Sequence, residues 1–260
     1  MRLYSALIVK NSLARPGVHL LTVHAPALAQ AAQPGQYVMA RCCHAQATDP
    51  LLRRPFFIHT VNRVQGDCSL LVQARGRGTS WLTQQREGVT LDFLGPLGHG
   101  WDLRPSVGNL LLICEGALIP GLTLLAQVAI EQERAVTLLA HCERAEDVYP
   151  PALLPSEVEY HIVTSDGSVG QQGMLVDIVG QYLPWADAAF CCLAPELAAA
   201  LYNRYEKMRV KRFAQAILLH PLVCASGVCL TCALQTASGT KLMCRDGPVF
   251  DLREVARAPM

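Results

Sequence analysis

Long apolar runs and an excess of charge of either sign are both missing from this chain of 260 residues. Its longest apolar stretches, Leu110–Cys114 and the interrupted Ala117–Ile130, are shorter than the roughly 20 residues that a membrane-spanning helix needs. The 22 Lys and Arg balance 21 Asp and Glu, so electrostatics give no reason to expect nucleic acid or an anionic membrane as a partner. A hydrophobic content of 51% with 17% charged residues excludes a disordered chain and favours globular domains.

An export signal is also absent from Met1–Gly17, which has no charged leader, apolar stretch or cleavage site. We therefore expect a cytoplasmic protein whose eleven cysteines stay reduced. Seven of them are scattered, and because a free cysteine behaves as a small buried hydrophobe, we expect them to serve packing alone. These seven are Cys42, Cys43, Cys68, Cys114, Cys142, Cys191 and Cys192.

The remaining cysteines have the spacing C-x4-C-x2-C-x11-C and are Cys224, Cys229, Cys232 and Cys244. A C-x4-C-x2-C run followed by a distant fourth cysteine is the ligand pattern of plant-type [2Fe–2S] clusters. The small residues 225–227 let such a loop fold back closely enough to surround a cluster with thiolates and backbone N–H groups. We expect Cys244 to arrive from a β-hairpin that turns at Ser238-Gly239.

The spacing leaves two alternatives to this cluster open. A four-cysteine zinc site usually has two C-x2-C pairs, whereas only Cys229 and Cys232 have that spacing here. The four residues could also be unrelated buried cysteines without a metal. Because the zinc interpretation leaves Cys224 as a misfit, the iron–sulfur cluster is the prediction.

The first hundred residues have the pattern of short strands separated by turns, which predicts a small β-barrel or sandwich. The expected strands are Leu3–Val9, Val18–His24, Tyr37–Arg41, Phe56–Val61, Ser69–Gln73 and Thr90–Phe93.

After Gly95–Gly98 apolar strands alternate with helical segments, which is the pattern of a doubly wound parallel sheet. We expect strands at Asn109–Cys114 and Ala135–His141, with a helix at Leu122–Glu133 between them. The alternation is expected to continue over Tyr160–Val163, Met174–Leu183 and Ala188–Leu193. A further helix is expected at Pro195–Lys207. The chain thus divides into a β domain (residues 1–101), an α/β domain (102–215) and a cluster domain (216–260).

Two loops of the β domain carry residues that suit an anionic cofactor. Arg54, held by Pro55 at the start of a strand, can present a bidentate guanidinium to a pyrophosphate. In the second loop Gly76 and Gly78 permit close approach of the backbone to an anion, Thr79 offers a hydroxyl, and a helix N-terminus follows. Together with an iron–sulfur motif downstream, these loops indicate a flavin.

Several motifs together resemble the ferredoxin-NADP reductase superfamily over nearly the whole chain. The flavin-domain motifs are Pro34–Met39, Leu52–Phe56, Gly76–Thr79 and Gly95–Gly98, and the second-domain segment is Asp166–Gly170 with Gly173. The tail Cys244–Asp251 most resembles the electron-transfer subunits of NAD-linked, B-type dihydroorotate dehydrogenases. The Arg-Arg-Pro and Cys-Arg-Asp-Gly-Pro-Val-Phe motifs are fairly specific, whereas the glycine turns are not.

The resemblance implies an antiparallel flavin-binding β-barrel, a doubly wound NAD-type domain and a small C-terminal [2Fe–2S] domain. It implies one FAD, one cluster, an NAD site, and an FMN-containing catalytic dihydroorotate dehydrogenase subunit of pyrimidine biosynthesis as the partner in a hetero-oligomer. Phe56 and Phe57 would flank the flavin, and Gly78 with Thr79 would hold the pyrophosphate. The implied FAD contacts are Arg54, Pro55, Phe56, Phe57, Leu71, Val72, Gln73, Gly76, Gly78 and Thr79.

Departures from the family's pattern lie along the expected hydride path from nicotinamide to flavin. Phe57 stands where a serine is usual near the flavin's reactive nitrogen, and Gln73 stands where an arginine is usual. In the dinucleotide loop Glu115 puts a carboxylate where phosphates should sit, and Leu118 adds bulk where the backbone must approach them. Leu193-Ala194-Pro195 replaces the usual Cys-Gly-Pro by the nicotinamide. We hypothesise that NAD(H) binding is weak or lost.

The predicted function is electron transfer between FAD, the cluster and a partner chain, with no catalytic residue for substrate chemistry on this chain. An apolar face around the cluster loop, with Val223, Val228 and Leu230, is expected to meet that partner. The alternatives are the corresponding subunit of a hydrogenase or of an NADH-dependent ferredoxin:NADP oxidoreductase. A further alternative is a non-catalytic relative that keeps the fold and the cluster for structure.

Overall fold

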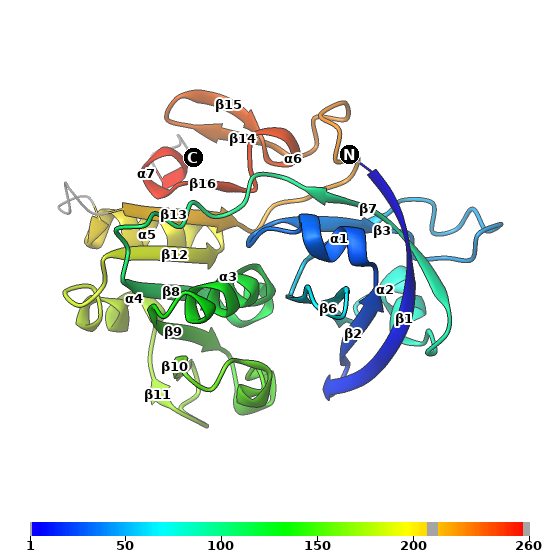
Figure 1. Ribbon diagram of the computed structural model, residues 1–260. Helices are drawn as coiled ribbons and strands as arrows, with labels where there is room; N and C mark the ends of the chain where they lie inside the picture. Colours follow the sequence, from blue (N-terminus) through cyan, green and yellow to red (C-terminus); the bar gives the residue numbers. More distant parts are fainter. Residues whose placement is uncertain (1, 207–212, 257–260) are drawn as a thin grey trace.

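The computed structural model describes residues 2–206 and 213–256, and its first hundred residues form a curled antiparallel sheet (Figure 1). The strands are β1 (Arg2–Arg15), β2 (Val18–His24), β3 (Tyr37–Ala40), β4 (Arg54–Phe57), β5 (Thr60–Asn62), β6 (Asp67–Gln73) and β7 (Thr90–Leu97). They pair in the order β4-β3-β7-β1-β2-β6-β5. Alternate apolar residues such as Leu70, Val72 and Phe93 point inside the curl and form its core. The short helices α1 (Pro26–Ala31) and α2 (Arg77–Thr83) accompany this sheet.

The second sheet is parallel except at one edge. Its strands are β8 (Asn109–Glu115), β9 (Ala135–Cys142), β10 (Glu159–Thr164), β11 (Gln171–Gln172), β12 (Ala188–Leu193), β13 (Phe213–Leu218) and β16 (Val249–Asp251). They lie in the order β11-β10-β9-β8-β12-β13-β16, and β16 is antiparallel to β13. Because both faces of a parallel sheet are covered, β12 is buried along its whole length.

Helices cover the two faces of this sheet, as a doubly wound fold requires. Helix α3 (Pro120–Glu131) packs on one face, and α4 (Leu175–Ile178), α5 (Pro195–Arg204) and α7 (Leu252–Ala256) pack on the other. Short 3-10 turns lie at η1 (Gly116–Leu118), η2 (Ala145–Asp147), η3 (Pro151–Leu153) and η4 (Val179–Gln181). The predicted fold class, an antiparallel β unit followed by a parallel α/β sheet, is confirmed, although the first sheet is a curled half-barrel.

The cysteine-rich segment leaves the second sheet and returns to it. After β13 the chain forms the cluster loop (residues 219–232), the hairpin β14 (Ala233–Thr236) and β15 (Gly239–Leu242), and the single turn α6 (Met243–Asp246). It then re-enters the sheet as β16, where Val249 pairs with Ile217 of β13. Figure 1 shows this segment at the top, above the junction of the two sheets. The domain boundary expected after residue 215 lies inside β13.

Some predicted elements differ from the structure. The strand expected at Phe56–Val61 is two strands, β4 and β5, because Ile58 N–H donates to Gln36 O at 3.0 Å and His59 N–H donates to Ser69 O at 2.9 Å. Each of these bonds pulls the backbone toward a different strand, so the extended run breaks between them.

The remaining differences concern where elements begin and end. The hairpin turns one residue earlier than expected, since Thr236 pairs with Gly239 and Ser238 is in the loop. The segment expected at Met174–Leu183 is α4 followed by η4, and Lys207, the expected end of the next helix, lies outside the described residues. The strand β1 continues to Arg15, well past the expected Val9, because its second half pairs with all of β2.

A buried polar network joins the two sheets. His59 of the first sheet accepts or donates at both ring nitrogens, with Nδ1 2.9 Å from Ser69 Oγ and Nε2 2.6 Å from the hydroxyl of Tyr149 in the α/β unit. The Thr123 hydroxyl of α3 donates to His59 O at 2.6 Å. The bonds from His59 to Tyr149 and from Thr123 to His59 O fix the orientation of the two units, because buried polar groups need hydrogen-bond partners and these partners lie in the other unit.

The seven scattered cysteines are all buried, as the packing interpretation predicts. Among the helices in the described ranges, none combines the length and the apolar character needed to cross a bilayer.

Candidate functional site

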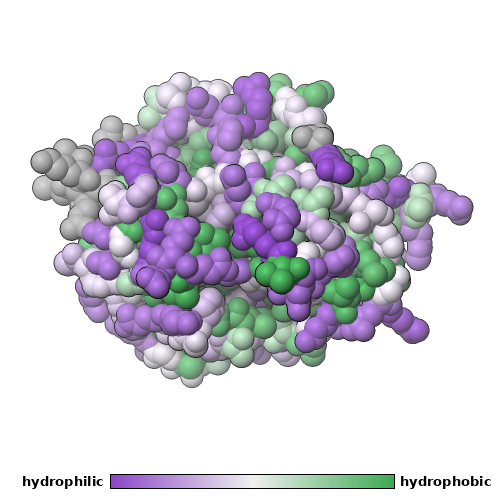
Figure 2. Space-filling view, viewed as in Figure 1, coloured by the Kyte–Doolittle hydropathy of each residue, from purple (hydrophilic) through white to green (hydrophobic). Residues whose placement is uncertain are grey.

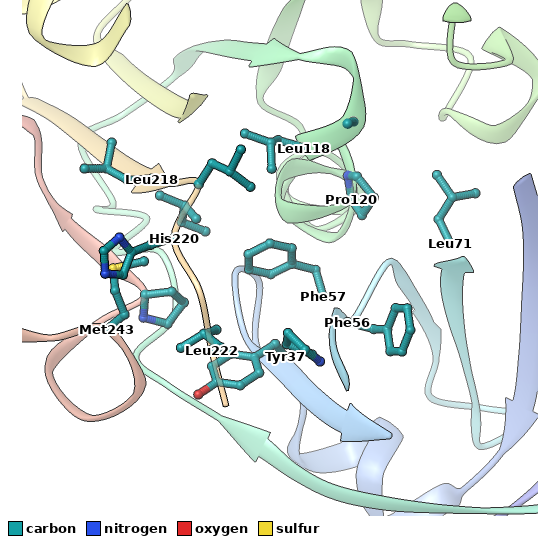
Figure 3. A pocket seen from close by; sticks show the side chains of 15 residues that line it. Tyr37, Phe56, Phe57, Leu71, Leu118, Pro120, Leu218, His220, Leu222 and Met243 are labelled. Carbon is teal, nitrogen blue, oxygen red and sulfur yellow. The ribbon is translucent and has the colours of Figure 1, made fainter. Parts of the chain in front are cut away.

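A cavity of about 220 Å³ lies where the two sheets and the cysteine-rich segment meet (Figure 3). Its lining is mostly apolar, which suits a flat aromatic ligand. The first sheet contributes Tyr37, Pro55, Phe56, Phe57 and Leu71; the α/β unit contributes Ala117, Leu118 and Pro120; the end of β13 and the cysteine-rich segment contribute residues 217–220, Leu222, Met243 and Pro248.

Phe57 stands in the middle of this cavity, between the first sheet and α3. In Figure 3 the rings of Phe57 and Phe56 point to opposite sides of the strand. A Cβ atom added at Gly121 would lie 3.7 Å from Phe57 Cδ2, so the ring reaches the first turn of α3. The ring thus occupies the space between any flavin on the first sheet and the start of α3.

The three residues of β6 that were predicted to meet FAD face different surroundings. Leu71 lines the cavity, while Val72 is fully buried inside the curled sheet and can offer a ligand only its backbone. Gln73 lines a second cavity of about 240 Å³, where its Oε1 accepts from Arg75 Nε at 2.7 Å. The alternation of side chains along a strand places Val72 on the face opposite to Leu71 and Gln73.

The two adjacent arginines of the first loop have different roles. Arg53 is held in the sheet, donating to Met39 O and Asp92 O at 3.2 and 3.0 Å and pairing with the Asp92 carboxylate at 2.9 Å. Toward the described residues, the Arg54 side chain donates only through Nη1, to the carbonyls of Leu52 and Arg53. Its other nitrogens are therefore available to an anion, and the role of Arg54 as a phosphate ligand stays a prediction.

The glycine loop lies next to Arg54. A Cβ atom added at Gly78 would lie 3.1 Å from Cys42 Cβ and 3.7 Å from Arg54 Nε, so this position has little room for a side chain. The Thr79 hydroxyl accepts from the N–H groups of Arg75 and Gly76 at 2.9 and 3.0 Å. Thr79 thus already serves to shape the loop, and its role toward a pyrophosphate remains a prediction.

In the predicted dinucleotide loop, a side chain of the loop already takes a backbone hydrogen-bond donor. The Glu115 carboxylate accepts the backbone N–H of Ala194, the residue just before α5. The second cavity beside it carries Glu143 and Asp147 as well as Arg15 and Arg75, so its charge is mixed. A mixed, partly acidic surface is a poor receptor for a pyrophosphate.

The four cysteines of the motif belong to the cluster loop and α6, the segments that bring Leu222 and Met243 to the first cavity. Cys232 and Cys244 are buried, with their sulfurs 3.3 Å apart, while Cys229 is exposed and Cys224 is partly exposed. The loop between them is tightly folded, since Ala225, Gly227 and Leu230 all have positive φ, at 57°, 79° and 57°. Such turns direct successive N–H groups inward, as an anionic cluster requires.

Hydrogen bonding and burial separate the thiols into two pairs. Bonds from Ser226 and Cys229 lower the pKa of the Cys224 thiol to about 5, and the Ser226 N–H lies 3.4 Å from its sulfur. Burial, followed by the neighbouring Cys232, raises the pKa of Cys244 to about 11. Two pairs of sulfur ligands fit a centre of two irons. In the parts of the chain that the structure describes, no three potential ligands converge on one ion, so the preference for the cluster over zinc rests on the spacing of the cysteines.

Tyr37 is a site residue that the sequence places in a flavin-domain motif and a strand but to which it assigns no role. It is 1% exposed, lines the first cavity, and packs against Ala225 and Leu222 of the cluster loop. Among the described residues its hydroxyl has no hydrogen-bond partner. A tyrosine in an apolar strand gives no signal for such a position, because the contact joins residues nearly two hundred positions apart.

Comparison with known proteins fits this geometry. Residues 221–256 match the family described as the iron-sulfur cluster binding domain of dihydroorotate dehydrogenase B. Over 95% of its length the chain is 33% identical to the "Dihydroorotate dehydrogenase B (NAD(+)), electron transfer subunit" of Geobacillus thermodenitrificans, and covers 96% of that protein. The chain belongs to the family of dihydroorotate dehydrogenase B electron transfer subunits. The electron transfer subunit of Desulforamulus reducens is 28% identical, with 96% of each chain covered.

Solved structures agree with this family at the level of the fold. A structure of the NADH-dependent reduced ferredoxin-NADP oxidoreductase superposes with a TM-score of 0.82 at 22% identity, covering 96% of this chain and 88% of that one. The cytochrome b5 reductase domain of Ulva prolifera nitrate reductase gives 0.64 at 18% identity, covering 80% and 93%. The chain therefore has the fold of the ferredoxin-NADP reductases.

Proposed function

We propose that this chain carries electrons between FAD in the first cavity and a [2Fe–2S] cluster on Cys224, Cys229, Cys232 and Cys244. The observation that carries the proposal is the shared wall: residues of the first sheet and of the cluster loop line one apolar cavity. When bound, a flavin exchanges electrons in twos or singly and the cluster exchanges them singly. The apolar wall excludes water between the two sites.

The chain's own residues hold the two groups in fixed places. Arg54 and Pro55 would meet the phosphate side of FAD beside Gly78, Phe56 and Phe57 would flank the flavin, and Leu71 would lie in the strand beneath it. The turns at Ala225 and Gly227 direct backbone N–H groups toward the cluster sulfurs. In this proposal residues 1–101 bind FAD, residues 102–215 form the NAD-type unit, and residues 216–260 hold the cluster.

The partner is the FMN-containing catalytic subunit that oxidises dihydroorotate, in a hetero-oligomer of pyrimidine biosynthesis. Support comes from the family and from exposed apolar side chains around the cluster: Leu219, Val228 and Leu230 are 60%, 81% and 61% exposed. Val223 is only partly exposed. Apolar atoms are visible over this loop at the upper right of Figure 2. Large apolar groups next to a redox site favour a protein partner that covers them.

NAD(H) binds weakly or not at all in this proposal. The Glu115 contact with Ala194 and the ring of Phe57 beside Gly121 both support it, because each uses space or a donor that a dinucleotide needs. The flavin then exchanges electrons with another carrier. A reducing compartment such as the cytoplasm suits a chain with eleven unpaired cysteines.

Purification of the tagged chain from its native cell tests the proposal. We expect flavin and [2Fe–2S] absorbance in the isolated protein, with the dihydroorotate-oxidising subunit identified by mass spectrometry of co-purifying chains. If a hydrogenase subunit or another reductase subunit co-purified instead, the proposed partner would be wrong, but the proposed role of this chain in electron transfer would stand. Protein that contains neither chromophore after anaerobic reconstitution would contradict the proposal and favour a structural role.

A further inference from the structure

The hydroxyl of Tyr37 is a buried polar group without an acceptor among the described residues. The residue is 1% exposed, and its hydroxyl is buried. Buried hydroxyls in folded proteins are nearly always hydrogen-bonded, since an unpaired one forfeits its hydration without compensation. A group bound at a neighbouring site can supply the acceptor that the described residues do not.

The flavin site and the cluster site both adjoin Tyr37 and could supply that acceptor. The packing of the ring distinguishes between them. The ring contacts Ala225 and Leu222, both of which belong to the cluster loop. In Figure 3 the hydroxyl points away from Phe57 and toward the segment that carries Leu222. The ring edge also lies against Gly98, where an added Cβ atom would be 3.2 Å from Tyr37 Cε1, so the side chain cannot easily swing elsewhere.

Burial keeps this hydroxyl a donor. Burial raises the pKa of Tyr37 well above its usual value, and the thiols of Cys244, Cys232 and Cys224 raise it further. Burial disfavours the charged phenolate, so the O–H keeps its proton and remains available for donation.

We propose that Tyr37 donates a hydrogen bond to sulfur of the cluster, on the Cys244 side. The bond thereby sets the reduction potential of the cluster relative to that of the flavin. This inference rests on the proposed function. A donor to cluster sulfur stabilises the reduced, more negative state and so raises the reduction potential. Tyr37 is a positioning residue in this role, because it transfers no proton and forms no bond other than the hydrogen bond.

Redox titration of the purified protein, followed by electron paramagnetic resonance for the cluster and by absorbance for the flavin, tests this proposal. For Tyr37→Phe we expect the cluster potential to become more negative while the flavin potential stays unchanged. We also expect iron–sulfur stretching frequencies that shift in D2O in the wild type to shift less in this variant. Tyr182→Phe, on a tyrosine that packs against His161 in the α/β unit, should leave both signals unchanged.

Several outcomes would overturn the inference. An unchanged cluster potential in Tyr37→Phe would do so, and a shift confined to the flavin would assign the hydroxyl to the flavin instead. If Tyr37→Phe fails to fold, Tyr37→Met keeps similar bulk without a donor and should give the same negative shift. Wild-type protein without cluster absorbance would overturn the proposed function together with this inference, whereas the first two outcomes leave the proposed function intact.

Discussion

The ring nitrogen Nε2 of His59 lies 2.6 Å from the hydroxyl of Tyr149, and this contact joins the curled sheet to the α/β unit. The histidine is buried between Ser69 and Tyr149 with no carboxylate bonded to its ring. Burial therefore disfavours its charged form and lowers its pKa from 6.5 to about 4.

Stability should consequently fall in mildly acidic solution. Between pH 6.5 and 4 the unfolded chain binds a proton that the native chain does not, so unfolding becomes easier as the pH drops through this range. Over this range the free energy of unfolding falls by on the order of 3 kcal/mol. Thermal unfolding at a series of pH values should show this slope in the wild type and a weaker one in His59→Gln. The exposed His44→Gln should keep the wild-type slope, and an equal slope in all three would contradict the assignment.

Loss of one buried cysteine ligand should remove the cluster. Cys244→Ala takes away one of the two sulfurs that lie 3.3 Å apart, leaving three ligands for two irons. We expect most of the iron and the visible absorbance to be lost while flavin is retained. Cys43→Ala is the matched control, because Cys43 is also buried but its thiol bonds only to Ala47 O within its own loop. Full iron content in Cys244→Ala would show that the ligand set is wrong.

Arg54→Ala should weaken FAD binding. A hydrogen bond to a charged group contributes about 1.5–3 kcal/mol, which corresponds to about a 10- to 150-fold increase in Kd. Quenching of flavin fluorescence on binding gives the Kd directly. The exposed Arg86→Ala should bind FAD like the wild type. If instead Arg54→Ala bound FAD normally, the phosphates would have to lie elsewhere.

Phe57→Ser should improve electron exchange with NADH. The substitution removes the ring that lies between the first sheet and the first turn of α3, and so opens space next to Gly121. We expect the wild-type flavin to bleach slowly with NADH under anaerobic conditions and the variant to bleach at least about tenfold faster, a change of about 1.4 kcal/mol in the barrier. Phe57→Leu keeps most of the bulk and should behave like the wild type. Rapid wild-type bleaching at micromolar NADH would contradict the weak-binding hypothesis.

The sequence predicts the parts of this molecule whose signals are local. The strands Val18–His24 and Ala188–Leu193 have the predicted bounds, because an uninterrupted apolar or alternating run defines them. The four cysteines are recognisable because their spacing is itself the signal. The break between β4 and β5 depends instead on acceptors at Gln36 and Ser69, which no local pattern announces.

Long-range contacts account for the rest of what the sequence could not show. Tyr37 acquires its position from residues of the cluster loop, and Glu115 from the backbone of Ala194. The strand β13 was not predicted, since its first residues were assigned to the α/β unit and the remainder to the cluster domain. Only its pairing with β12 and β16 makes it a strand of the sheet.

The pairing of Ile217 with Val249 has a consequence for how this protein can change. Directly opposed residues of antiparallel strands have Cα atoms about 5 Å apart, so residues 219–248 enter and leave the sheet at nearly one point. Residues 219–248 are therefore a single insertion between β13 and β16 at the edge of the sheet. A short turn that joined these two strands would leave a reductase of two domains without a cluster. Conversely, one insertion at the same place would add a one-electron carrier to another reductase.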